Sequence, residues 1–138
     1  MLKDIIKKIE KNGILSRNSF NKRDINTLLD LREEAEFDTE WMRVYNMLKQ
    51  KEVNDIYKDD INTICEKAYL AAYELSNSSD IAGYISDDFE LISKAYIVGL
   101  NDEWLNALIR SYTEDEFPCG RLKLGNCDRD EVYKNLIK

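Results

Sequence analysis

Two acidic pairs hold the groups in this sequence with the most obvious capacity for chemistry. They are Asp87-Asp88 and Asp102-Glu103, within "SDDFELISKAYIVGLNDEW" at residues 86–104, and each pair directly precedes an aromatic residue. Paired carboxylates can act as general acid and base, bind a divalent cation, begin a helix, or meet a basic partner. The rest of the sequence decides among these four kinds of chemistry.

Metal chemistry has little support. The chain has no histidine, which excludes histidine-based zinc and di-iron signatures. Its three cysteines, Cys65, Cys119 and Cys127, lack the paired CxxC spacing of a zinc site. "DRDE" at 128–131 lacks the glycine and the ligand spacing of a calcium loop. We expect no metal and no cofactor, with a magnesium site made of carboxylates alone as the open alternative.

Catalysis is also disfavoured. Without histidine no Ser-His or Cys-His pair can form, and there is no glycine-rich phosphate loop. Carboxylates at polar helix starts have depressed pKa values, which does not suit a general acid. We therefore expect a protein that is not an enzyme. A carboxylate-dependent hydrolase is the rival hypothesis.

Helix capping explains each acid singly. Three segments share the order cap, any residue, acid, aromatic, and they predict N-caps at Asp38, Ser86 and Asn101. A cap accepts hydrogen bonds from free backbone N–H groups and contributes about 1 kcal/mol. An acid in the first turn meets the positive end of the helix dipole.

Helical periodicity extends along most of the chain. One proline and five glycines in 138 residues are too few for the turns of an all-β protein. Apolar residues at 3–4 spacing predict a helix from Leu2 to near Asn12-Gly13, and Gly99 and Asp128 predict one helix end and one helix start. The remaining helices are expected at 21–37, 38–52, 54–75 (the longest), 86–98 and 101–112, with a short turn at 80–85.

The predicted fold is all-α. We expect one domain over residues 1–138, built as a helical bundle or as stacked helical hairpins with about six to eight helices. A short extended segment near 121–125 is the open exception, because the surrounding region is irregular.

Charge is unevenly distributed. The net charge is −7, yet residues 1–23 have seven Lys/Arg against two acids, or +5, which leaves −12 on residues 24–138. Such a body repels nucleic acid and anionic membranes and attracts a basic protein, although net negative charge can also serve solubility alone. The odd cysteine number, the absence of a secretion signal and the absence of a long apolar run predict a cytoplasmic protein.

A partner-binding surface is predicted from the acids. If helices 87–99 and 102–112 are antiparallel, the run 114–116 returns near Asp87-Asp88. A solvated charged edge is the equal alternative. The candidate residues are Asp87, Asp88, Glu90, Asp102, Glu103, Tyr112, Glu114, Asp115 and Glu116.

One segment carries a family resemblance. "YISDDFELISKAYIVGLNDEWLNALIRSYTEDEFP", residues 84–118, resembles immunity proteins of bacterial polymorphic toxin and contact-dependent growth inhibition systems, in its S-D-D-F-E-L-I start, Gly99, Trp104-Leu105 and Phe117-Pro118. The resemblance implies a small, acidic, non-enzymatic protein that binds and blocks a cognate toxin domain, often a basic nuclease. It implies a monomer that forms a 1:1 heterodimer. An acidic helical adaptor that binds a basic host protein or mimics DNA is the alternative.

Overall fold

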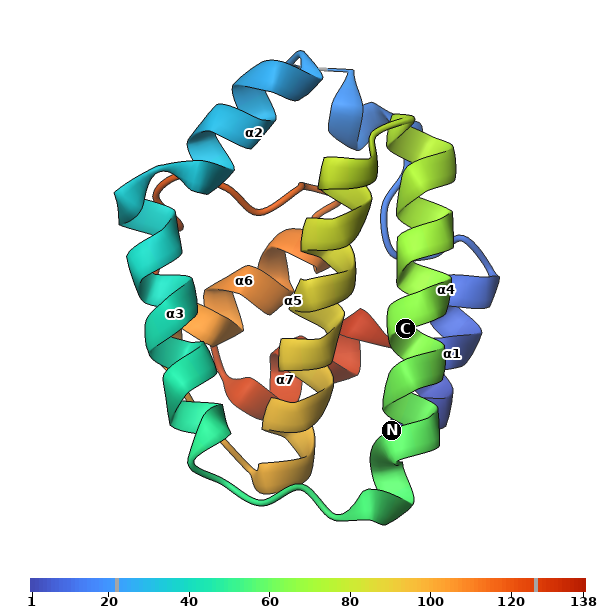
Figure 1. The fold of residues 1–138 in the computed structure, drawn as a ribbon, viewed down its shortest axis with the longest axis vertical. Coiled ribbons are helices and arrows are strands. Elements are labelled where there is room, and N and C mark those ends of the chain that lie inside the picture. The colour runs from blue at the N-terminus through green and yellow to red at the C-terminus, as the bar shows by residue number, and fades with distance from the viewer. Residues whose placement is uncertain (22, 126) are drawn as a thin grey trace.

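Helices make up the fold throughout the computed structural model, which describes residues 1–21, 23–125 and 127–138 (Figure 1). The all-α prediction is confirmed, and over these ranges the segment near 121–125 forms no strand. The elements in chain order are α1 (Leu2–Glu10), the 3₁₀ helix η1 (Arg17–Phe20), α2 (Ile25–Glu33), α3 (Ala35–Lys49), the 3₁₀ helix η2 (Asp55–Tyr57), α4 (Lys58–Ser76), α5 (Ser79–Val98), α6 (Glu103–Thr113) and α7 (Arg129–Leu136).

α5 runs through the middle of the molecule and lies side by side with α4 (Figure 1). Ala68 and Ala72 of α4 are buried, and their small side chains let neighbouring helices approach closely. α1 packs on α4, whereas α6 and α7 pack on each other behind α5. α3 lies at the opposite edge from α4, beside α5.

α5 is one helix of 20 residues and the longest that the structure describes. The predicted helix start at Ser86 is therefore wrong, and so is the prediction that residues 54–75 form the longest helix. The helix starts at Ser78, whose side chain accepts a hydrogen bond from the Ile81 N–H at 3.2 Å. Ser86 lies mid-helix and donates its hydroxyl hydrogen bond to the Cys65 carbonyl at 2.9 Å. A buried stripe at 81, 85, 89 and 92 is continuous through this point, which favours one helix over two. Gly99 ends the helix at φ 72°, as predicted.

The other helix starts show how local capping competes with burial. α3 begins at Ala35, three residues before the predicted cap Asp38, because Phe37 is buried and must lie on the inward helix face. α6 is capped by Asp102 and not by Asn101, with its carboxylate accepting from the Leu105 N–H at 2.9 Å.

Two further starts follow the same chemistry. α2 starts at Asp24, which accepts from the Thr27 N–H at 2.8 Å, rather than at residue 21. The predicted cap at Asp128 is confirmed, since it accepts from the Glu131 N–H at 3.1 Å.

Candidate partner-binding surface

A buried ion pair lies beneath the surface of interest. Asp88 of α5 is fully buried, and its carboxylate receives both terminal nitrogens of Arg32 at 2.9 and 2.5 Å. Trp41 Nε1 donates to the same carboxylate at 2.9 Å, and the Tyr112 hydroxyl donates at 2.6 Å. Each carboxylate oxygen therefore accepts two hydrogen bonds, which satisfies a charge that burial would otherwise penalise.

Arg32 is enclosed as completely as its partner. Its guanidinium carbon lies 4.4 Å from the Phe37 ring centroid, 5.0 Å from Tyr84 and 5.4 Å from Phe117. Burial alone would lower the pKa of Arg32, but the charge of Asp88 and its hydrogen bonds raise that pKa above the ordinary value. Burial, and then the Asp88 charge, raise the pKa of Tyr112 well above its usual range. The network therefore holds a cation, an anion and a neutral phenol at neutral pH.

This network corrects the predicted surface. Asp88 and Tyr112 do meet, but they meet in the core, where neither can contact a partner. Arg32 and Trp41 are the members that sequence reasoning missed. The position of Arg32 in the helix could have indicated its role. It follows buried Leu28 by four residues on the inward face of α2, where a charged side chain must have a buried partner.

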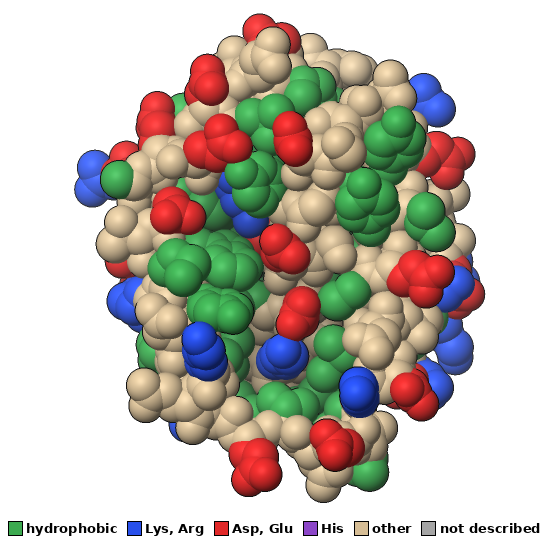
Figure 2. Space-filling model, viewed as in Figure 1, with side chains coloured by type: hydrophobic (Ala, Val, Ile, Leu, Met, Phe, Trp, Pro, Cys, Tyr) green, Lys and Arg blue, Asp and Glu red, His purple; other side chains and the backbone are tan. Residues whose placement is uncertain are grey.

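Above the network, a groove of about 510 Å³ separates α3 from α5. Figure 2 shows this hollow, with hydrophobic side chains along its α3 side and acidic groups on the ridge of α5. Its lining residues are Trp41, Tyr45, Leu48, Lys49, Lys51, Val53, Asp87, Glu90, Leu91 and Lys94.

The α3 wall of the groove is an aromatic stack. The Trp41 and Tyr45 rings lie 5.5 Å apart at an interplanar angle of 16°. Tyr45 is 39% exposed, and the Lys49 ammonium lies 5.8 Å from its ring centroid. Because Asp88 holds the indole N–H of Trp41, the orientation of this wall is fixed from the core.

The α5 wall carries two acids with different surroundings. Glu90 accepts a hydrogen bond from Lys94 at 2.7 Å. Asp87 is exposed at the rim, and no hydrogen bond or ion pair reaches its carboxylate from the described part of the chain. Partial burial and the neighbouring charges of Asp88 and Glu90 raise the pKa of Asp87, although Arg32 opposes them. Asp87 is thus a partly buried acid next to other anions, whereas an acid at a helix start would have a lowered pKa.

A second apolar feature lies on α4. Tyr69, Leu70 and Tyr73 are exposed, and the two tyrosine rings stack at 6.5 Å and 8°. Hydrophobic side chains gather over α4 on the same face as the groove (Figure 2). We call these three residues the α4 patch.

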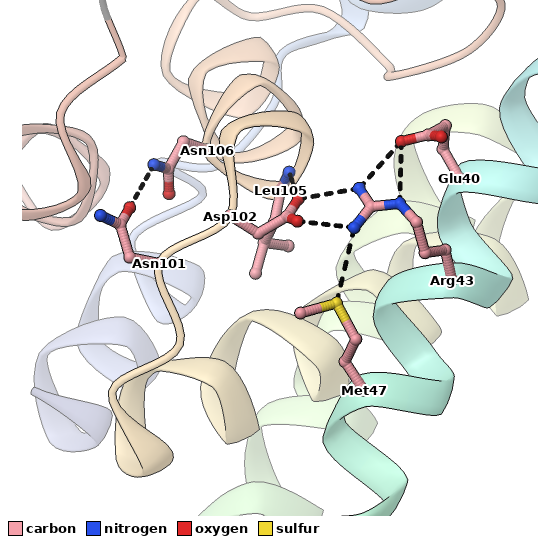
Figure 3. A network of polar contacts seen from close by, with 7 residues as sticks. All are labelled: Glu40, Arg43, Met47, Asn101, Asp102, Leu105 and Asn106. Carbon is pink, nitrogen blue, oxygen red and sulfur yellow. Dashed lines mark hydrogen bonds and ion pairs between the residues drawn. The ribbon is translucent and has the colours of Figure 1, made fainter.

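The carboxylate of Asp102 is held by contacts within the protein and is not left open to a partner. Arg43 of α3 donates two hydrogen bonds to it, at 2.7 and 3.1 Å, and also contacts Glu40 at 2.8 Å (Figure 3). Burial would raise the pKa of Asp102, but the hydrogen bonds from Arg43 and the Leu105 N–H lower it. Asp102 therefore both caps α6 and ties it to α3.

The remaining predicted residues lie away from the groove. Asp115, at φ 60°, accepts from the Ser16 N–H and the Ser19 hydroxyl, both at 2.7 Å, and so ties η1 to the end of α6. Glu103, Glu114 and Glu116 are exposed but do not line the groove. Of the nine predicted residues, only Asp87 and Glu90 come together there.

Over residues 1–21, 23–125 and 127–138, the structure contains no group of three His, Cys, Asp or Glu side chains placed to hold a metal ion. Within the same ranges, none of the helices is both long and apolar enough to cross a membrane.

Comparison with known families decides the identity. The model of the family Immunity protein PIM1 matches residues 4–119, which includes the groove, the α4 patch and the Arg32–Asp88 network. The chain belongs to this family. No curated protein matches the sequence. The resemblance to immunity proteins is confirmed, and the role of an immunity protein is to neutralise a cognate toxin.

Proposed function

We propose that this immunity protein binds a basic toxin domain, a nuclease, and covers its active site or its substrate surface. The family match over residues 4–119 carries the toxin-neutralising part of the proposal, because immunity proteins neutralise a cognate toxin. The proposed protein acts by binding and not by catalysis. It works in the cytoplasm as a monomer that forms a 1:1 heterodimer with its toxin.

Charge supports a basic partner. Residues 24–138 have a net charge of −12, and a nuclease must present cations to bind phosphates. An acidic inhibitor is attracted by those same cations, which speeds association and directs it to the substrate surface. Occupation of that surface would exclude nucleic acid without any chemical step.

The groove and the α4 patch lie on one face of the molecule, and this is the face on which the toxin is proposed to bind. Tyr45, Tyr69 and Tyr73 are exposed aromatic side chains, and acids lie between the two features. Stable interfaces bury about 1,600 Å² and depend on a few aromatic anchors surrounded by polar groups. We propose Tyr45 and Tyr73 as anchors on either side of α5.

The direct test uses the toxin domain that the proposed function expects a neighbouring gene to encode. Co-expression should restore growth to cells that make the toxin, and the purified pair should bind 1:1 by calorimetry with loss of nuclease activity. Tyr45→Ala should weaken binding at least tenfold, whereas Glu131→Gln on exposed α7 should not change it. Normal toxicity during co-expression of folded protein would overturn the proposal. Recovery of a transcription factor instead, in a pull-down, would favour the adaptor hypothesis.

A further inference from the structure

We infer that the α3–α5 groove is a receptor for a single arginine or lysine side chain of the partner, whose cation lies against the Trp41–Tyr45 rings and pairs with Asp87. The inference rests on the proposed function and names the chemical group that the site would recognise. Three features carry it: an aromatic wall held from the core, a carboxylate that pairs with no cation among the described residues, and a difference in charge along the groove.

The aromatic wall is prepared in advance. Trp41 is held by its hydrogen bond to Asp88, and Asp88 is held by Arg32, so the indole cannot rotate away without breaking a buried contact. Cations are attracted to the faces of Trp and Tyr rings within about 6 Å of the centroid. The Lys49 ammonium already lies 5.8 Å from the Tyr45 ring centroid, so a partner cation would compete with it at that ring and not at Trp41.

The lining of the groove includes three lysines, Lys49, Lys51 and Lys94, and two acids, Asp87 and Glu90, and one of these acids has no cation paired with it. Glu90 is paired with Lys94, and the charge of Asp88 is matched by Arg32. Asp87 lines the same groove as Trp41 and has no such partner in the described residues. Partial burial, and then the charges of Asp88 and Glu90, raise its pKa, while Arg32 lowers it. An incoming guanidinium would relieve that repulsion and form a charge-assisted hydrogen bond.

The groove also has a direction. α3 and α5 run the same way along it (Figure 1), and Lys49 and Lys94 come about two turns after Trp41 and Asp87. At a rise of about 1.5 Å per residue, the backbone positions of the two lysines lie about 10 Å further along the helices. Their ammonium groups reach back, to 5.8 Å from the Tyr45 ring centroid and to 2.7 Å from the Glu90 carboxylate. These ammonium groups repel a partner cation from the outer part of the Tyr45 ring and from Glu90, which favours its approach to Trp41 and Asp87. The volume of about 510 Å³ is within the range of small-ligand sites.

The first arm of the test needs no toxin. The probe is the blocked peptide acetyl-Gly-Gly-Arg-Gly-Gly-amide, titrated into isotope-labelled protein and followed by NMR, with a citrulline peptide as the neutral control of the same shape. We expect saturable shifts at the Trp41 indole N–H and the Asp87 amide, and at least tenfold weaker binding of the citrulline peptide. Asp87→Asn should weaken the arginine peptide at least fivefold, Lys49→Met should strengthen it, and Glu131→Gln should leave it unchanged.

Equal binding of the two peptides, or shifts centred away from the groove, would overturn the inference. The second arm measures toxin affinity. Toxin binding that changes less than twofold in Asp87→Asn would overturn the receptor while the proposed function stands. A positive peptide titration without any toxin binding would support the receptor and overturn the proposed function.

Discussion

Asp87 and Asp88 are adjacent residues with opposite environments. Consecutive helix positions point about 100° apart, so one carboxylate enters the core and the other meets the groove. Asp88 lies three residues after buried Ile85 and four before buried Ile92, on the inward side of α5. The pair that looked uniform in the sequence thus has one structural member and one member available to a partner.

Replacing Asp88 should damage the fold. Asp88→Ala leaves Arg32 charged and buried without a counter-ion, and should reduce the free energy of unfolding by about 3–5 kcal/mol in urea denaturation. The matched control is Asp87→Ala, at the exposed neighbour, which should change stability by about 0.5 kcal/mol or less. Similar losses for both variants would contradict the burial of the network.

The charge of Asp87 should lower the free energy of unfolding at neutral pH. Its pKa is raised in the folded state by burial and by Asp88 and Glu90, so folding favours its protonated form. Asp87→Asn should therefore raise the melting temperature slightly at pH 7. That gain should disappear below about pH 3, where aspartate is protonated in both states. A variant less stable than the parent at pH 7, or a gain that does not depend on pH, would show that the charge is not repelled.

At the scale of helices, starts were harder to predict from the sequence than ends. Gly99 ends α5 as expected, because a left-handed residue has a clear glycine signal. Ser86 was predicted as an N-cap because a serine followed by acids is a common start of a helix. The buried stripe of α5 overrides that local preference, and only tertiary packing shows which of the two wins.

Prediction of the site was limited in the same way, because tertiary packing decides which residues come together. Acid content indicated a binding protein, and Asp87 and Glu90 do line the groove. The partners of Asp88 come from α2, α3 and α6, between 24 and 56 residues away in the chain. A pairing at such separation leaves no local pattern beyond a charged residue in an apolar stripe. The groove likewise depends on the spacing of α3 and α5, which periodicity does not specify.

Two glycines of α5 should respond oppositely to the same substitution. Gly83 lies inside the helix with no atom within 4 Å of an added Cβ, so Gly83→Ala should stabilise the protein by about 0.5–1 kcal/mol. Gly99 has φ 72°, and Gly99→Ala should destabilise it by about 1 kcal/mol because alanine is strained there. Thermal and urea unfolding of both variants measure this. A loss at both positions would argue that α5 is broken near Gly83.

Across the whole molecule, opposite charges are separated. The basic helix α1 is joined to acidic α4 by the Lys3–Asp60 pair at 3.0 Å and the Lys67–Glu10 pair at 3.3 Å. In Figure 1, α1 lies behind α4, on the side away from the groove between α3 and α5. The lysines of α1 therefore lie away from the groove, and the charge distribution favours the approach of a cationic partner from the groove side.

The association rate should show this separation. With the toxin domain as partner, raising NaCl from 50 to 500 mM should slow association about 10- to 100-fold in stopped flow, because screening weakens long-range attraction. Dissociation should change much less, since it depends on contacts at short range. A rate constant of association that does not respond to salt would contradict electrostatic steering by this protein.

The buried Arg32–Asp88 pair has a consequence for the history of this protein. It stabilises the relative positions of α2, α3, α5 and α6 from within, while Tyr45, Asp87 and Glu90 contribute little to that stability. Mutations at the rim can therefore accumulate without unfolding the chain. The protein can adapt to sequence changes in its toxin by altering only those positions. A library randomised at the rim, with the pair kept intact, is for the same reason a practical start for directed evolution of inhibitors against new toxins.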